Sequence, residues 1–323
     1  MRLGTAAADA LLLAAAAIWG STFIAQKLAT EHMGPVAFNG VRFCLGALVL
    51  LPFAARRLRT IADPRVRRES VAGGLVAGVA MTFGSSLQQV GMHDTTASNA
   101  GFITGLYVII VPMLGLLAGQ RVGWNVWWGA ALAVVGLFFL SLFDPGGGAP
   151  TWNPGDAWVL CCAFAWAVHV QVIGRAAPRA DALVISVVQF AVTGAVALAA
   201  SQLLAALAPG SDWGAREALS ATDLRAVAWP LAYATLLSTC VAFTLQTVAQ
   251  GSAPPAHAAL LLSLEGVFAA LAEAACQAAG WAGLGAPLTR WKLFGCALML
   301  AGVILSQWRF RPAERPVSPA GPG

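Results

Sequence analysis

Long apolar segments recur along the whole chain, each close to the length that a helix needs to cross a lipid bilayer. Their approximate limits are 9–26, 35–53, 71–90, 95–118, 125–143, 155–174, 181–205, 227–249, 255–277 and 291–308. A hydrocarbon layer about 30 Å thick requires roughly 20 apolar residues in a helix, and a helix satisfies all of its backbone polar groups within one such segment. The pattern predicts an all-α integral membrane protein with about ten transmembrane helices.

The composition agrees with a membrane protein and excludes a nucleic-acid-binding domain. Hydrophobic residues make up 59% of the chain and charged residues 10%, against about 45–50% and 25% in soluble domains. The net charge of +5 arises mainly from arginines in the loop Arg56–Arg68 and at the ends of apolar segments, as in loops that face anionic lipid. No nucleic-acid-binding motif accompanies these arginines. The expected partner is therefore the lipid bilayer, and no nucleic acid.

The cysteines give no sign of metal or redox chemistry. All six lie within or beside apolar segments, at Cys44, Cys161, Cys162, Cys240, Cys276 and Cys296. They form neither a CxxC pair nor a Cys–His spacing typical of zinc sites. We expect them to behave as small buried hydrophobic residues, and we expect no metal site and no cofactor.

The distribution of basic residues predicts the orientation in the membrane. With the amino terminus in the cytoplasm, thirteen Lys and Arg residues fall on the inner side and five on the outer side. Because inner loops of membrane proteins carry the excess of Lys and Arg, both termini are predicted to be cytoplasmic. The protein is then a multi-pass protein of the cytoplasmic membrane.

The chain contains an internal repeat. The stretch "ADALLLAAAAIWG" (Ala8–Gly20) aligns with "GDAWVLCCAFAWA" (Gly155–Ala167) at an offset of 147 residues, and "VRF" at 41–43 aligns with "VQF" at 188–190. Further along, "SNAGFITGLYV" (98–108) aligns with "AHAALLLSLEG" (256–266) at an offset of 158. We predict a first repeat at 1–149, a second at 150–310 and a disordered cytoplasmic tail at 311–323. Each repeat holds an odd number of helices, so the two must insert in opposite directions, as in many secondary transporters.

These repeats resemble the drug/metabolite transporter superfamily, specifically its EamA-type members with two repeats. The resemblance is carried by "WGSTF" (19–23), "VRF", "LQQVGMHDTTASNAGFITGLYVIIVP" (87–112) and "LLLSLEGVFAAL" (260–271). It implies ten helices, alternating access around a central cavity, and export of amino acids, other metabolites or toxic compounds. Two positions depart from the family pattern. Gly266 follows Glu265 where the family often has Pro, and Gln120 precedes Arg121 where an acidic residue is common.

Two charged residues within the apolar segments are the main candidates for function. Glu265 lies near the centre of the segment 255–277, where a carboxylate is costly to bury and usually faces a cavity. Three roles are open to Glu265: a proton carrier, a counter-charge for a cationic substrate group, or a structural carboxylate held between helices. Tyr107 is its counterpart in the first repeat. Arg42, with Asn39 one turn earlier, either binds a substrate carboxylate through its guanidinium or extends to the nearby membrane surface.

Other polar and aromatic residues complete the predicted site. His169 is a proton relay or a neutral imidazole hydrogen-bonded within the core, and Trp19 and its repeat counterpart Trp166 either line a cavity or pack against other helices. The predicted cavity-lining residues are Trp19, Asn39, Arg42, Gln88, Thr104, Tyr107, Trp166, His169, Gln189 and Gln246, and Glu265 is the proton-coupling candidate. Several of these polar residues also have a simpler interpretation as ties between helices.

The sequence favours a secondary transporter that moves a small organic metabolite, such as an amino acid, in the direction of export. Protons are the candidate coupling ion. An intramembrane enzyme is the first alternative, because "GSS" (84–86) with His169 or His257 offers a serine and a histidine at depth. No nucleophile elbow or HExxH motif accompanies them, so we expect no enzymatic activity. A membrane scaffold without transport activity is the second alternative.

Overall fold

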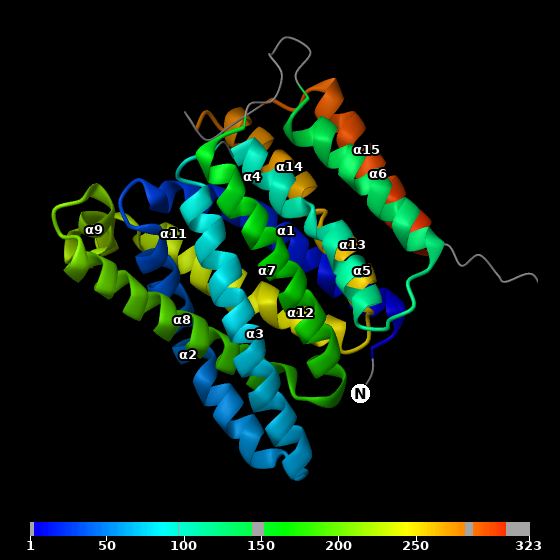
Figure 1. Ribbon diagram of the computed structural model, residues 1–323, viewed down its shortest axis with the longest axis horizontal. Helices are drawn as coiled ribbons and strands as arrows, with labels where there is room; N and C mark the ends of the chain where they lie inside the picture. Colours follow the sequence, from blue (N-terminus) through cyan, green and yellow to red (C-terminus); the bar gives the residue numbers. More distant parts are fainter. Residues whose placement is uncertain (1–2, 96, 144–151, 282–286, 308–323) are drawn as a thin grey trace, which may run out of the picture.

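The computed structural model describes residues 3–95, 97–143, 152–281 and 287–307, and all regular structure in these ranges is helical (Figure 1). The first half contains α1 (Thr5–Thr30), α2 (Pro35–Thr60), α3 (Pro64–Gly91), α4 (Ala97–Gly105), α5 (Tyr107–Leu117) and α6 (Trp124–Ser141). The second half contains α7 (Pro154–Ala176), η1 (Ala177–Arg179), α8 (Ala182–Leu207), α9 (Asp212–Glu217), α10 (Ala221–Ala226), α11 (Ala228–Tyr233), η2 (Ala234–Ala242), α12 (Phe243–Gln250), α13 (Pro255–Leu262), α14 (Glu265–Ala278) and α15 (Arg290–Gln307). The predicted all-α membrane fold is confirmed.

The helical stretches match the predicted transmembrane segments closely. In the described ranges, nine stretches are long and apolar enough to cross a bilayer, with α4–α5, α11–η2–α12 and α13–α14 each forming one interrupted span. The helix α15 has the same 18-residue length as α6 and packs beside it, but it begins with Arg290 and Lys292, which lower its mean hydropathy. We count α15 as the tenth helix of the bundle. The predicted repeat boundary at 149/150 and the tail 311–323 lie outside the described residues and stay predictions.

Repeat-related helices pack against each other in opposite directions. The "VRF" and "VQF" stretches lie on α2 and α8, and the rings of Phe43 and Phe190, at equivalent positions of the two repeats, are 6.1 Å apart. Three residues before Phe43, the backbone of Gly40 lies against Leu198, eight residues after Phe190. The chain therefore runs in opposite directions along α2 and α8. Equivalent helices that meet in antiparallel orientation are the geometry of an inverted repeat.

A second repeat-related pair, α6 and α15, is held together by close contacts at glycines on both helices. A Cβ atom at Gly136 would lie 2.7 Å from the carbonyl oxygen of Gly295, and one at Gly129 would lie 2.6 Å from that of Gly302. In lipid, helices gain association energy from such close backbone approach, because no hydrophobic force draws two apolar helices together. The two helices lie side by side, apart from most of the bundle, in Figure 1.

We expect Gly136→Ala to destabilise the protein, because the added methyl group meets backbone atoms that cannot rotate away. Overpacking of this kind costs about 1–3 kcal/mol. The measurement is the thermal unfolding midpoint in detergent, followed by size-exclusion chromatography. The control is Gly101→Ala on α4, where the nearest atom to an added Cβ is 3.9 Å away. Equal midpoints for the two variants would contradict the packing described for α6 and α15.

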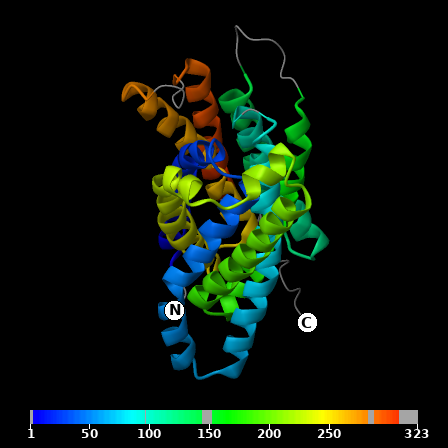
Figure 2. The ribbon, with the colours of Figure 1, turned by 90° about the vertical axis from the view of Figure 1, so that its left-hand side faces the viewer.

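One end of the molecule carries a basic hairpin. The helices α2 and α3 extend past the others at the end where the amino terminus lies (Figure 2). Arg57 on this hairpin donates from Nε to Oδ2 of Asp181 at 2.7 Å, and Asp181 also caps the start of α8 by accepting from the backbone of Leu183 and Val184. The hairpin is therefore fastened to the connection between the α7 and α8 helices.

The opposite end is closed by the short helix α9. Glu217 is fully buried there and its two carboxylate oxygens accept hydrogen bonds from the backbone N–H groups of Val36 and Ala37, at 3.0 and 2.6 Å. Burial raises the pKa of Glu217, and the backbone N–H donors limit that rise. The carboxyl group satisfies two otherwise unpaired donors in the first turn of α2. It thereby holds α9 against the start of the helix that carries Arg42.

Candidate substrate cavity

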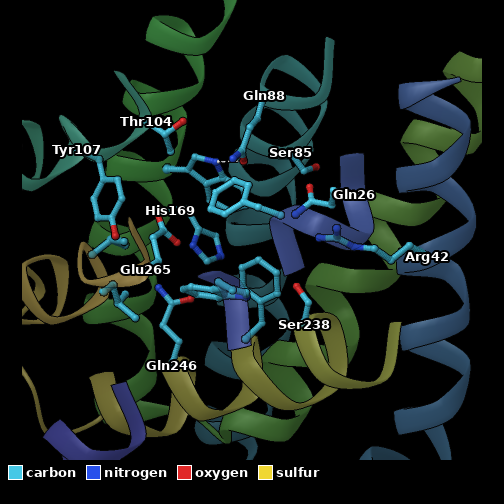
Figure 3. Close-up of a pocket in the computed structure, with 16 residues that line it drawn as sticks. Gln26, Arg42, Ser85, Gln88, Thr104, Tyr107, His169, Ser238, Gln246 and Glu265 are labelled. Atoms are coloured by element: carbon cyan, nitrogen blue, oxygen red, sulfur yellow. Dashed lines mark hydrogen bonds between the residues drawn. The ribbon is translucent and has the colours of Figure 1, made fainter. Parts of the chain in front are cut away.

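A cavity of about 60 Å³ lies between helices of both repeats (Figure 3), with room for a few water molecules. Its lining is Trp19, Phe23, Gln26, Arg42, Ser85, Gln88, Thr104, Tyr107, Trp166, His169, Val170, Ser238, Phe243, Gln246, Leu262 and Glu265. The contributing helices are α1, α2, α3, α4, α5, α7, η2, α12, α13 and α14. Binding sites of inverted-repeat transporters lie at this kind of interface between repeats.

Two helix interruptions at equivalent positions point into the cavity. Between α4 and α5, and again between α13 and α14, the backbone hydrogen bonds tighten locally: Leu106 N–H bonds to the carbonyl of Ile103, and Leu264 N–H to that of Leu261. The first residues after these interruptions are Tyr107 and Glu265. Short tight turns within long helices often mark hinges or functional positions. The interruptions thus place the two repeat-related side chains at the starts of half-helices that face the cavity.

Glu265 and Arg42 lie at opposite ends of the cavity (Figure 3). Within the described part of the chain, the carboxylate of Glu265 has no hydrogen bond or ion pair. Arg42 is 4% exposed, donates from Nε to Oγ1 of Thr239 at 3.1 Å, and leaves its Nη1 without a partner. Buried charges are normally paired, since an isolated one is costly. Both groups are therefore available to a ligand.

An aromatic cluster fills the space between the two charges. The ring of Phe243 lies 4.7 Å from that of Trp19 and stacks on Trp166 at 5.8 Å and 21°. Phe243 also touches His169, Phe43 and Phe190. The Nε1 atom of Trp166 donates to Gln88 at 3.1 Å, whereas Nε1 of Trp19 has no partner. The walls between the charges are therefore apolar and flat, with a few directed polar groups.

His169 is part of the hydrogen-bonded core at the edge of the cavity. Its Nε2 lies 2.9 Å from Oε1 of Gln189, and since an amide oxygen only accepts, Nε2 carries the proton. Its Nδ1 has no partner. No hydrogen bond joins His169 to Ser85, which lines the same cavity, or to Ser86 in the described structure. The serine–histidine pair that an intramembrane protease requires is therefore not formed by these residues.

The structure brings together all of the predicted site residues except two. Asn39 instead donates to the backbone oxygen of Ser85 at 2.9 Å and so ties α2 to α3. Gln189 lies behind His169 as its hydrogen-bond partner. Both side chains are buried and polar, and the sequence gives no means of separating such ties between helices from cavity walls. Substrate contact by the remaining residues stays a prediction.

Phe243 and Ser238 line the cavity but are absent from the predicted site, and an irregular helix places them there. On an α-helix, residues five positions apart point in different directions. The segment η2 is instead a π-helix, in which hydrogen bonds span five residues. This brings Ser238 and Phe243 to the same cavity and puts Thr239 against Arg42. Phe23, Gln26, Ser85, Val170 and Leu262 also line the cavity. Of these, Phe23 and Gln26 follow Trp19 at helical spacing.

The helix ends near the amino terminus are in contact. His257 at the start of α13 lies 2.7 Å, through Nε2, from Oδ1 of Asp9 on α1. The backbone N–H of Leu3 donates to Oγ of Ser252 at 2.9 Å. His257 therefore makes a hydrogen bond at a helix start. The side chain of Asn99, its repeat counterpart, lies outside the described residues.

A family model and the curated relatives agree that this chain is similar to transporters. A model of the EamA-like transporter family matches residues 6–142 and again 153–308. An "Uncharacterized transporter" of Archaeoglobus fulgidus is 31% identical over 303 residues, covering 94% of this chain and 86% of that protein. The "Uncharacterized inner membrane transporter YedA" of Escherichia coli K12 is 25% identical over 191 residues, or 58% of this chain and 59% of the relative. A crystal structure with 19% identity aligns over 95% of this chain and 97% of its own, with a TM-score of 0.68, and so shares the fold.

Proposed function

The chain belongs to the EamA-like transporter family, and from this premise we propose that it exports an amino acid or a related small zwitterion in exchange for protons. It is a multi-pass membrane transporter with a small-molecule substrate. The observation that carries the finer proposal is that Arg42 and Glu265, two charges without an ion-pair partner among the described residues, lie at opposite ends of an aromatic cavity.

The two charges suit the two ends of a zwitterion. Arg42 lines the cavity and its Nη1 has no hydrogen-bond partner. Guanidinium groups bind carboxylates with matched geometry. The carboxylate of Glu265 is the complementary partner for an ammonium group. The aromatic rings between the two charges offer apolar surface to a substrate side chain and can also attract a cation. These rings belong to Trp19, Trp166 and Phe243. A substrate with only one of the two charged groups would leave the other buried charge unpaired.

Glu265 also supplies a mechanism of coupling. In a cavity with no protein partner, its carboxylate is stable only when a proton or a cationic group neutralises it. A proton and the substrate ammonium group therefore compete for the same site. Competition of this kind links substrate release on one side to proton uptake from that side. Since protons flow inward across the cytoplasmic membrane, the exchange drives the substrate outward.

Alternating access and orientation follow from the repeats and the charges. Inverted repeats allow one conformation to open to each side by exchange of the two repeat conformations. The arginines of the α2–α3 hairpin, at the end of the molecule where the amino terminus lies, support a cytoplasmic position for that end. The side that holds Lys27 and α9 is then the outer side.

Proteoliposomes loaded with a pooled panel of amino acids and related metabolites test the proposal. We expect mass spectrometry to show loss of one class of zwitterion, accelerated when the outside is made acidic. The matched amine and carboxylic acid analogues, which each carry one of the two charges, should be retained. Loss that is unaffected by the pH gradient would contradict proton exchange, and loss of the single-charge analogues at equal rates would contradict the two-charge site.

A further inference from the structure

A second cavity of about 90 Å³ lies next to the first, and the two share two lining residues, Phe23 and Glu265. The second cavity runs between α1, α4, α6, α14 and α15. Its deep end lies at Gly105 and Glu265. At its other end lie Lys27, in the last turn of α1, and Ser141, the last residue of α6. It therefore extends from Glu265 towards the outer ends of these helices.

The mouth of this second cavity carries charges of both signs. Lys292 and Glu273 form a loose ion pair of 3.7 Å, with side chains 20% and 33% exposed. Lys27 is exposed and has no ion-pair partner among the described residues. Glu273 lies two helical turns beyond Glu265 on the same face of α14. The mouth thus offers ammonium and carboxylate groups that match both ends of a small zwitterion.

The partition between the two cavities is thin. Gly20 on α1 packs directly against α14, where an added Cβ would lie 2.5 Å from the carbonyl oxygen of Glu265. One turn along α1, the partly exposed ring of Phe23 borders both cavities, as does the side chain of Glu265. The close contact at Gly20 fixes the two helices relative to each other. The ring of Phe23 is the part of this partition that can rotate without moving a helix.

At the opposite end, the inner ends of α1 and α13 are joined by the Asp9–His257 contact at 2.7 Å. We propose that the second cavity is the outer vestibule of the transport path, and that the Phe23 ring is the gate between this vestibule and the central cavity. This inference rests on the proposed function. The vestibule receives a small zwitterion as it leaves Arg42 and Glu265, and the charges at its mouth hold that substrate briefly before release.

Cysteine accessibility tests the vestibule and the gate without requiring that the substrate be known. The six native cysteines are free and are first replaced in the full-length chain. Single cysteines are then introduced as Gly101→Cys in the vestibule, where the nearest atom to an added Cβ is 3.9 Å away, and Ser238→Cys in the central cavity. A membrane-impermeant thiol reagent is added to the outer side of intact spheroplasts. Thr60→Cys on the exposed inner hairpin reports any leakage of the reagent.

We expect Gly101→Cys to react from the outside and Thr60→Cys not to react. We expect Phe23→Ala to raise the modification rate of Ser238→Cys by about tenfold or more, equivalent to removing a barrier of roughly 1.4 kcal/mol. Phe23→Trp should lower that rate. Phe23→Leu should give an intermediate rate and provides a second test if the alanine variant does not fold. If Gly101→Cys does not react from the outside, the second cavity is not an outer vestibule. If the modification rate of Ser238→Cys is the same in all three Phe23 variants, Phe23 is not the gate. Neither outcome depends on whether the substrate is a zwitterion.

Discussion

Replacing Glu265 with Gln is expected to abolish proton-driven export while leaving the helical fold intact. The Gln side chain has almost the same shape but cannot bind a proton and offers no negative charge to an ammonium group. Removing one partner of a buried charge pair costs about 2–5 kcal/mol, so substrate affinity should fall by about 30-fold or more. The measurement is efflux from proteoliposomes with and without an acidic exterior. The variant should lose the acceleration that the gradient gives to the unmodified protein.

The control for this prediction is Glu69→Gln, which removes a carboxylate from the exposed start of α3. That variant should retain gradient-driven export. Glu265→Asp, which keeps the acid but shortens the side chain, should retain coupling at a reduced rate. Unchanged gradient dependence in Glu265→Gln would show that Glu265 is a structural carboxylate and that another group carries the proton.

Replacing Arg42 with Gln is expected to produce the second large effect, on substrate binding rather than on coupling. Arg42 lines the cavity, its Nη1 has no hydrogen-bond partner and its Nε is held by Thr239, so the group is oriented before the substrate arrives. Loss of its charge should raise the KM for a zwitterion by about 30-fold or more, by the same energetic argument. Arg42→Lys keeps the charge but loses the forked geometry and should give an intermediate KM.

Thr239→Val tests whether the orientation of Arg42 matters, because it removes the accepting hydroxyl and conserves the shape. Its KM should rise less than that of Arg42→Gln, with an unchanged maximal rate. Arg68→Gln on the exposed hairpin is the matched control and should behave like the unmodified protein. Equal KM values for Arg42→Gln and Arg68→Gln would indicate that Arg42 serves the packing of α2 alone.

The sequence predicted the helices and their inversion because both depend on patterns that extend over many residues. Apolar segments of bilayer length identify the spans, and the matched stretches around Trp19 and Trp166 identify the repeat. The same patterns placed Arg42 and Glu265 within spans. A charge in an apolar segment is a strong signal, because its energetic cost requires a compensating environment. Both side chains do line the central cavity.

The parts that the sequence did not predict depend on local backbone geometry. Phe243 touches most of the aromatic residues around the cavity, yet its place there requires the π-helical turn of η2, which shifts the helical phase. Asn39 and Gln189 have the same polarity as true lining residues but are turned into contacts between helices. The interruption before Glu265 has no proline beside it and so carries no sequence signal.

The central claim is that the carboxylate of Glu265 binds a proton and the substrate alternately, never both at once. Proton release on substrate binding tests it most directly, measured with a pH indicator in weakly buffered detergent solution across the pH range in which the protein is stable. We predict that adding the transported zwitterion releases protons from the unmodified protein and from Arg42→Lys, and releases none from Glu265→Gln. Saturable substrate binding without proton release at any pH, or equal release from Glu265→Gln, would contradict the claim.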